Sequence, residues 1–425
     1  MKKIKLQQQH QQIVGSIVIV MVAVIGTIWL LATHAATPTA STEPENSTRS
    51  SQVTVGSDTN ASGGKYIQFG TGSGGGGTST NASGLPWKSG VYSEKVTPDQ
   101  FGAWRGRPID FVEAYNWEQC WNSSQCSDTM DDTYSVNDLV GSGYHGNVVY
   151  AQALMPKDYN GGYTLEACAA GNYNSDFTTI ATRLKNGNFA SVDVRLGWEM
   201  NGGWYAWGIG YNPPGITNQN KESVWISCYQ KAHDAMKAVY PALTFDWNPT
   251  KDSSNMYDGK NASATYPGDS YVDTIGVDFY DYYPAYANDA QWNNTSTSGT
   301  GCYEHYPAGA TSVDTPYGLC TWLTFAQSHG KKLAFPEWAI SNYGSFGTSG
   351  GGGDNAYFIN KMYQFFQANA GSIAYEAYFN TSNYTTGAYG KTCVFQVYDT
   401  DPECSNNGSF INAQSQAAYL ANYHP

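Results

Sequence analysis

Eight short apolar segments, separated by stretches of helical periodicity, constrain the fold of this chain more than any other feature. They lie at residues 90–93, 109–115, 146–155, 192–197, 243–247, 274–280, 332–336 and 373–379. Helix-like patterns, such as an apolar residue at every third or fourth position, occur at 177–184, 225–239, 357–370 and 413–423. Strands that alternate with helices over this length predict an α/β fold, a (β/α)8 TIM barrel.

The N-terminus carries an apolar segment at residues 13–32, preceded by Lys2, Lys3 and Lys5. About 20 apolar residues can cross a bilayer as one helix, and the lysines place the N-terminus in the cytoplasm. Because residues 33–35 resemble a cleavage site, residues 1–35 are predicted to be either an N-terminal transmembrane helix, acting as a signal anchor, or a signal peptide. Both alternatives predict export, to the extracellular face of the cell membrane or into the medium as a secreted protein.

Residues 36–85 are rich in Ser, Thr, Gly and Asn, and few of them could contribute to a hydrophobic core. This composition predicts a disordered linker, with a little structure near residues 66–69. The barrel is then expected to occupy residues 86–425. Because no recognised motif falls within residues 1–85, we predict that catalysis survives their deletion.

The composition points outside the cytosol and away from nucleic acid. The formal net charge of −13 repels phosphate backbones. Aromatic residues make up 15% of the chain, including 33 Tyr and 13 Trp, a content that suits stacking on sugar rings or a Tyr-rich core. We expect a polysaccharide partner, a membrane contact through the N-terminal apolar segment, a monomer and no cofactor.

The eight cysteines indicate disulfides, because none shows the spacing of a zinc site, and no metal is expected. Eight cysteines allow about 105 pairings, so proximity alone guides the assignment. The predicted pairs, which imply an oxidising compartment, are Cys120–Cys126, Cys302–Cys320, Cys393–Cys404 and Cys168–Cys228.

Two glutamates follow predicted strands at positions where a barrel carries its functional groups. Glu199 comes after the fourth apolar segment and Glu337 after the seventh, each beside a tryptophan. Two carboxyl groups are what glycosidic cleavage requires, one as acid and one as nucleophile or base. An isolated glutamate is more often a helix cap or an ion-pair partner, but two at such strand ends favour catalysis.

The segment from Arg195 to Trp204, RLGWEMNGGW, resembles the acid/base motif of glycoside hydrolase family 26. Residues 245–249, 272–280 and 332–338 are similar to later segments of that family, in the same order, and the resemblance spans residues 88–425. The family consists mainly of endo-β-mannanases, with some glucanases and xylanases, on a retaining (β/α)8 barrel. One residue departs from the pattern: the family has His before the acid/base, where this chain has Trp198.

The resemblance implies a role for each matched residue. Glu199 would be the acid/base and Glu337 the nucleophile that forms a glycosyl-enzyme. Tyr280 would donate a hydrogen bond to Glu337, and Arg195 would pair with Glu337 or form a structural ion pair of the barrel. Asn201 would contact substrate hydroxyls or serve as a turn residue.

Further aromatic residues are candidates for substrate binding. Trp204, Trp207, Trp247 and Trp338 would be either sugar platforms or core residues, and Tyr283 would line the cleft on the loop after the sixth strand. The resemblance implies a retaining glycoside hydrolase of β-linked mannan or glucan, and these aromatic residues suit a sugar-binding cleft. Two alternatives remain: a non-catalytic glycan-binding protein on the same barrel, and a lytic or transglycosylating enzyme of cell-envelope glycans.

Overall fold

The chain divides into two units, Met1–Gly77 and Thr78–Pro425. The computed structural model describes residues 53–57, 65–69, 81–93, 96–116, 133–155, 163–211, 221–251, 262–281, 287–292, 318–342, 351–381, 393–398, 404–406 and 409–425. The predicted apolar segment at 13–32 lies outside these residues. Among those described, no helix is both long and apolar enough to cross a membrane.

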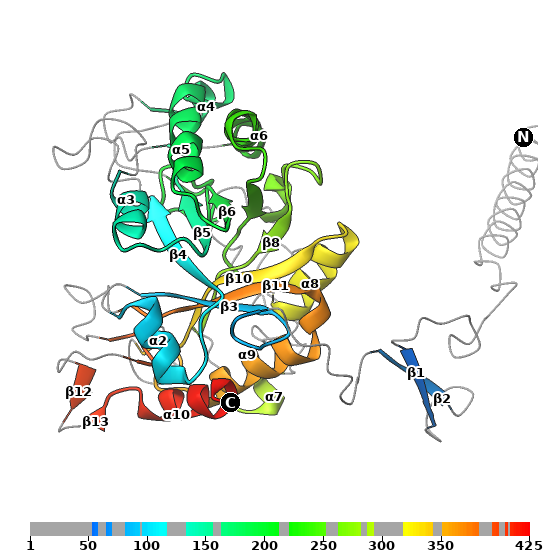
Figure 1. Cartoon of the computed structure of the whole chain (residues 1–425). Coiled ribbons are helices and arrows are strands. Elements are labelled where there is room, and N and C mark those ends of the chain that lie inside the picture. The colour runs from blue at the N-terminus through cyan, green and yellow to red at the C-terminus, as the bar shows by residue number, and fades with distance from the viewer. Residues whose placement is uncertain are drawn as a thin grey trace, which may run out of the picture. The chain divides into compact units, whose positions relative to one another are not determined.

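The first unit contains two strands within the range predicted to be a disordered linker. β1 (Val53–Ser57) pairs with β2 (Lys65–Phe69) in antiparallel register, with Val53 opposite Phe69. Antiparallel pairing satisfies backbone groups that a linker would leave to water. β2 covers the residues near 66–69 where the sequence predicts a little structure, whereas β1 is a strand in a range predicted to be disordered (Figure 1).

The second unit is a closed parallel barrel, as the alternation of segments predicts (Figure 1). Its strands are β3 (Lys88–Tyr92), β4 (Phe111–Asn116), β5 (Asn147–Gln152), β6 (Ser191–Leu196), β7 (Thr244–Trp247), β8 (Thr274–Gly276) with β9 (Phe279–Tyr280), β10 (Lys332–Ala339) and β11 (Ile373–Phe379). β8 and β9 both pair with β10 and together form the sixth strand. Pairing of β11 with both β10 and β3 closes the barrel.

Helices surround the barrel. They are α2 (Pro98–Arg105), α3 (Thr133–Gly141), α4 (Leu165–Ala169), α5 (Asn174–Asn186), α6 (Glu222–Val239), α7 (Asp289–Trp292), α8 (Leu319–Ser328), α9 (Ala356–Ala368) and α10 (Ala413–Tyr423). Two 3-10 turns, at Ala262–Thr265 and Ala370–Ser372, and a short pair of strands, β12 (Ser405–Asn406) and β13 (Ser409–Phe410), complete the described elements. The helices predicted from periodicity correspond to α5, α6, α9 and α10.

Local sequence fixes where helices begin and which face they bury. Thr97 caps α2: its hydroxyl accepts from the Gln100 backbone, and the Gln100 side chain accepts from the Thr97 backbone. On α5, the predicted stripe, which runs from Phe177 to Leu184, is buried against the barrel. Burying one apolar face of each helix closes the core around the parallel strands.

Two disulfides confirm predicted pairs. Cys168 on α4 is bonded to Cys228 on α6, and Cys393 is bonded to Cys404. Cys320 is also disulfide-bonded, but its predicted partner lies outside the described residues, as does the predicted pair at 120 and 126. The first bond fastens α4 to α6, which lie side by side on the outside of the barrel (Figure 1).

The barrel unit begins earlier than predicted. Ser83 is buried, and its backbone and hydroxyl both donate to the Asp110 carboxylate, at 3.0 and 2.6 Å. Leu85 is also buried in the core. Residues 81–85 therefore belong to the barrel rather than to the linker.

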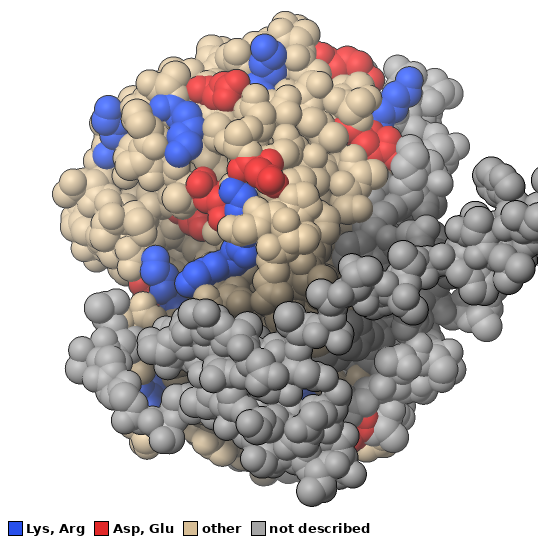
Figure 2. Space-filling view, turned by 90° about the vertical axis from the view of Figure 1, so that its right-hand side faces the viewer, with Lys and Arg blue, Asp and Glu red and all other residues tan. Residues whose placement is uncertain are grey.

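The described surface carries few charges of either sign. In Figure 2, Lys and Arg lie beside Asp and Glu, and most of the visible described surface is uncharged. This agrees with a chain in which only 13% of residues are charged. Such a face offers no extended basic field to a polyanion.

Candidate active site

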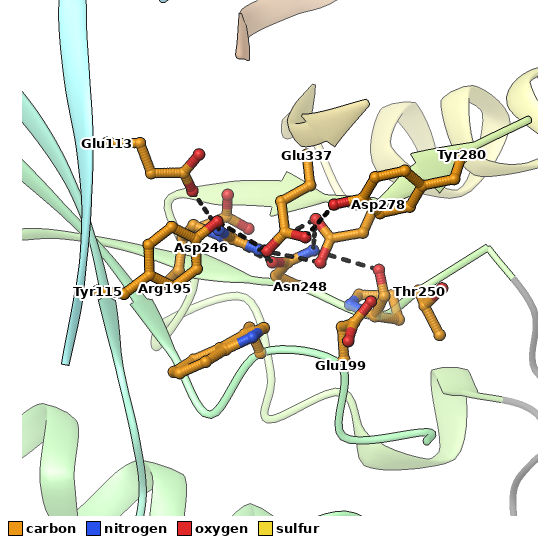
Figure 3. Close-up of polar contacts among 12 residues, drawn as sticks. Glu113, Tyr115, Arg195, Glu199, Asp246, Asn248, Thr250, Asp278, Tyr280 and Glu337 are labelled. Carbon is orange, nitrogen blue, oxygen red and sulfur yellow. Dashed lines mark hydrogen bonds and ion pairs between the residues drawn. The ribbon is translucent and has the colours of Figure 1, made fainter. Parts of the chain in front are cut away.

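The two glutamates predicted to be catalytic meet at the carboxyl ends of the barrel strands. Glu199 follows β6, the fourth strand, and Glu337 lies within β10, the seventh. Three carboxylate oxygens, one each from Glu199, Glu337 and Asp278, all lie within 4.8 Å of one another. Figure 3 shows Glu199 and Glu337 approaching from opposite sides, with Asp278 beside them.

Both glutamates keep a small contact with solvent. Glu199 is 9% exposed and Glu337 is 6% exposed. Trp204, which is 42% exposed, donates from Nε1 to Glu199 Oε2 at 2.7 Å. The pair is thus largely shielded from water yet reachable from the surface.

A turn with left-handed backbone presents Glu199. Gly197 has φ 61° and Glu199 has φ 52°, which is uncommon for a residue with a Cβ and costs on the order of 1–3 kcal/mol. The Glu199 amide is held by the Asn248 carbonyl at 2.6 Å, across the gap to the β7 loop. A Cβ at position 197 would strike Leu154, so glycine is required where the turn starts.

Glu337 is surrounded by donors. Its Oε1 accepts from Tyr115 and Arg195, both at 2.8 Å, and its Oε2 accepts from Tyr280 at 2.5 Å. A carboxylate accepts hydrogen bonds and donates none, so three donors suit its ionised form. The predicted contacts of Arg195 and Tyr280 with Glu337 are both present.

Arg195 is fully buried beneath the two glutamates. Its guanidinium also binds Glu113, Asn248 and both oxygens of Asp278. Because these groups occupy all three nitrogens of the guanidinium, Arg195 orients Glu337 and does not reach the substrate. Both alternatives predicted for Arg195, a pair with Glu337 and an ion pair within the barrel, are therefore present.

The electrostatic environment of Glu199 favours its protonated form. Burial and the nearby Glu337 charge raise the pKa of Glu199 to about 8, against the opposing effects of Trp204 and Arg195. At neutral pH, Glu199 therefore carries a proton that it can donate. Burial also raises the pKa of Asp278 well above its usual range, so the site holds less negative charge than its acids suggest.

Several predicted binding residues have other roles. Asn201 is buried, and its side chain bonds the Thr250 backbone in both directions at 3.0 Å, so it ties the β6 loop to the β7 loop. Trp247 is fully buried and packs on Tyr266, with ring centroids 5.1 Å apart. Neither offers a surface to a sugar. Tyr283 lies outside the described residues.

Trp338 and Trp207 are likewise core residues. Trp338 is fully buried and donates to Glu376 Oε2 at 2.6 Å, on the side of β10 away from the site. Trp207 is fully buried and donates to the Trp198 carbonyl at 2.8 Å. Of the four tryptophans predicted as platforms, only Trp204 has an exposed ring.

Trp198, which replaces the histidine of the family pattern, does not line the site with a polar group. It is fully buried, and its ring packs against Trp207 and Tyr205 at 4.8 and 5.0 Å between centroids. It fills the core beneath the turn that carries Glu199.

Sequence reasoning missed three members of the site: Glu113, Tyr115 and Asn248. Glu113 and Tyr115 are two residues apart in β4, so their side chains point to the same face of the strand. Alternating polar residues within an otherwise apolar barrel strand were the available signal. Asn248 follows β7 directly, at the strand end where barrel sites are built.

The three acids that approach one another could also ligate a cation, since carboxylate oxygens suit hard metal ions. Two of them, Asp278 and Glu337, already bind the Arg195 guanidinium at 2.9 and 2.8 Å. The guanidinium thus already supplies the positive charge that balances these two carboxylates. We therefore assign no metal site here.

Comparison with known proteins relates this barrel to one family. Residues 162–301 match the profile of glycosyl hydrolase family 26. Endoglucanase H of Acetivibrio thermocellus is 26% identical over 246 residues, 58% of this chain and 24% of that protein. Mannan endo-1,4-beta-mannosidase of Bifidobacterium adolescentis is 22% identical over 56% of this chain and 21% of its own length. The match spans about a quarter or less of each relative.

Among solved structures, the catalytic domain of a family 26 endo-beta-1,4-mannanase from Bacillus sp. JAMB-750 shares the fold. The TM-score is 0.50 at 15% identity, over 81% of this chain and 87% of that domain. The fold and site thus define a (β/α)8 barrel with two facing glutamates after its fourth and seventh strands. Together with the profile match over residues 162–301 and the two relatives, this makes the chain similar to glycosyl hydrolase family 26 over part of its length.

Proposed function

We propose that the protein is a retaining glycoside hydrolase that cleaves β-linked polysaccharide of the mannan or glucan type by double displacement. The observation that carries this proposal is the approach of Glu199 and Glu337 oxygens to within 4.8 Å. Retaining enzymes hold their carboxyl groups about 5–5.5 Å apart, whereas inverting enzymes need roughly 6.5–9.5 Å to admit a water.

In the first step, Glu199 donates its proton to the departing sugar oxygen while Glu337 attacks the anomeric carbon. Tyr115, Tyr280 and Arg195 hold Glu337 for this attack. The products are a covalent glycosyl-enzyme ester and an ionised Glu199. Positioning of both groups lowers the entropic cost of reaching the transition state.

In the second step, Glu199 must act as a base. Part of the rise in its pKa comes from the charge on Glu337, which the ester removes. The pKa of Glu199 therefore falls once the glycosyl-enzyme has formed. The same carboxylate then takes a proton from water, which attacks the anomeric carbon and releases Glu337.

The substrate class follows the two relatives, which are named for action on glucan and mannan. We would measure reducing-sugar release from β-1,4-mannan, mixed-linkage β-glucan and cellulose by wild type, Glu337→Gln and Glu199→Gln. The proposal predicts release from at least one polymer by wild type and near-complete loss in Glu337→Gln. Binding by a folded wild type without release from any polymer would instead support the non-catalytic glycan-binding alternative.

Transglycosylation uses the same glycosyl-enzyme, with a sugar hydroxyl in place of water. Mass spectrometry of the products separates the two: hydrolysis gives shorter chains only, whereas transfer also gives chains longer than the substrate. We propose hydrolysis as the main reaction. We further propose that the protein is exported, which the two disulfides support because such bonds persist in oxidising compartments.

A further inference from the structure

The inward face of β4 contributes two side chains to the site. Glu113 and Tyr115 both contact Nη1 of Arg195. The Tyr115 hydroxyl lies 2.8 Å from that nitrogen and 2.8 Å from Glu337 Oε1, so it accepts from the first and donates to the second. β4 thereby holds the guanidinium from one side while Glu337 and Asp278 hold it from the other (Figure 3).

The three acids around Arg195 differ in how many donors they receive. Glu337 accepts from three side chains. Asp278 accepts from Arg195 through both oxygens and from Asn248 at 3.1 Å. Glu113 binds Arg195 through Oε1, but its Oε2 is buried with no hydrogen-bond partner among the described residues.

The charges around Arg195 also bear on the state of Glu113. The charged and titratable groups that face Glu113 are Arg195 from β6, Glu337 from β10, Tyr115 from β4 and Asp278 from the turn between β8 and β9. One guanidinium cannot neutralise three carboxylates, and an uncompensated buried charge is costly. Burial raises the pKa of Glu113 to about 8, which agrees with a proton on its bare oxygen.

We propose that Glu113 is a positioning residue that works as a neutral carboxylic acid, protonated on Oε2 and holding Arg195 through Oε1. The charge of the guanidinium is then left for Glu337. The link to catalysis rests on the proposed function, since it takes Glu337 as the nucleophile. When Glu113 ionises, it competes for Arg195, draws the guanidinium toward β4 and loosens its hold on Glu337.

The protonation of Glu113 can be tested without any substrate. Glutamine has the shape of the protonated acid, so we would compare thermal unfolding of the full-length wild type and Glu113→Gln between pH 5 and pH 9. We expect the unfolding midpoint of the variant to rise relative to that of wild type as pH increases. The difference between the two midpoints should change by at least about 2 °C across this range. Exposed Glu166→Gln is the control and should show no such trend.

The opposite results would overturn the proposal. A variant that is less stable than wild type by the same margin at every pH would mean that Glu113 is an ionised partner of Arg195 throughout. Failure of Glu113→Gln to fold at pH 6 would also mean that Glu113 is ionised in the folded protein, because glutamine should replace a neutral carboxylic acid of the same shape.

The positioning role is tested on Glu337 itself. We would measure the rate at which 2,4-dinitrophenyl 2-deoxy-2-fluoro-β-glycosides, in manno and gluco forms, label Glu337 between pH 5 and pH 10. Dinitrophenolate leaves without a proton, so the Glu199 proton is not required. We expect the alkaline decline of labelling to move up by at least one pH unit in Glu113→Gln.

Glu376→Gln is the matched control, because Glu376 is a buried acid that contacts Trp338 and lies outside the Arg195 network. Its labelling profile should follow wild type. If labelling of Glu337 declines at the same pH in Glu113→Gln as in wild type, the positioning role is wrong. Wild type that is labelled by neither sugar at any pH would count against the retaining mechanism, while the unfolding series would still decide whether Glu113 is protonated.

Discussion

At Glu199, burial and Trp204 act on the carboxyl in opposite directions. Burial and the Glu337 charge raise its pKa to about 8, whereas the Trp204 hydrogen bond lowers it. The indole N–H stabilises the ionised form that the second step needs, and the exposed ring lies where a sugar can reach it. In the proposed mechanism, Trp204 therefore links proton transfer to substrate contact.

Trp204→Phe keeps an aromatic ring and removes the donor. A hydrogen bond to a charged group contributes about 1.5–3 kcal/mol, so its loss should raise the pKa of Glu199 by about one to two units. We expect the alkaline limb of the kcat/KM profile on a polysaccharide to move upward by that amount. An alkaline limb that stays in place, or moves to lower pH, would contradict this role.

Tyr280→Phe removes one of the three donors to Glu337. We expect kcat/KM to fall roughly 10–100-fold, since the lost bond is charge-assisted and short. Tyr378→Phe is the control, because that hydroxyl is also buried but donates to the Phe395 carbonyl. Equal losses of activity in the two variants would show that any buried tyrosine hydroxyl matters as much.

At this scale the sequence predicted which carboxyl groups meet better than it predicted which aromatic rings are exposed. Glu199 and Glu337 were found because a barrel puts its strand ends at one mouth. Trp204 and Trp247 could not be told apart, since both follow or end a strand among aromatics. Whether a ring faces the mouth or a helix depends on strand register and turn geometry, such as the left-handed backbone at Glu199.

At the scale of elements, periodicity located the eight strands and the helices α5, α6, α9 and α10. These segments bury one face against the barrel, so their apolar spacing is visible in the sequence. The contribution of β4 to the site was not predicted. The alternation of Glu113 and Tyr115 shows that they share a face of β4, but it does not show that this face contacts Arg195 on β6.

The bond between Cys168 and Cys228 joins α4 to α6 across 60 residues. A loop of that length predicts a stabilisation of about 4 kcal/mol from the lost entropy of the unfolded chain. Replacing both cysteines with serine should lower the free energy of unfolding by about that amount, measured by urea denaturation. No change in stability would mean that packing alone holds α4 on α6.

At the scale of the whole molecule, buried acids accumulate inside the barrel and beneath its helices. Burial raises the pKa of Glu113 and Asp193 to about 8, and that of Asp246, Asp281 and Glu376 to about 7. Each is therefore protonated more readily in the folded state than in the unfolded chain, where its pKa is near 4. Folding is favoured by low pH at these five groups.

Their stability contribution is complete below about pH 4 and is lost as pH rises toward 7–8, because the unfolded chain ionises first. We expect the free energy of unfolding to fall by at least about 3 kcal/mol between pH 5 and pH 8.5. Urea titrations across that range would check this. Stability that is flat or rising over the range would mean that these carboxyl groups ionise in the folded state at ordinary pH.

The stereochemistry of the first product tests the central claim most directly. A proton NMR time course of hydrolysis of a β-linked oligosaccharide reports which anomer forms before mutarotation. Attack by Glu337 followed by water predicts the β anomer first, because two inversions restore the configuration. Initial formation of the α anomer would contradict a glycosyl-enzyme at Glu337 and would require a water between two acids that lie within 4.8 Å.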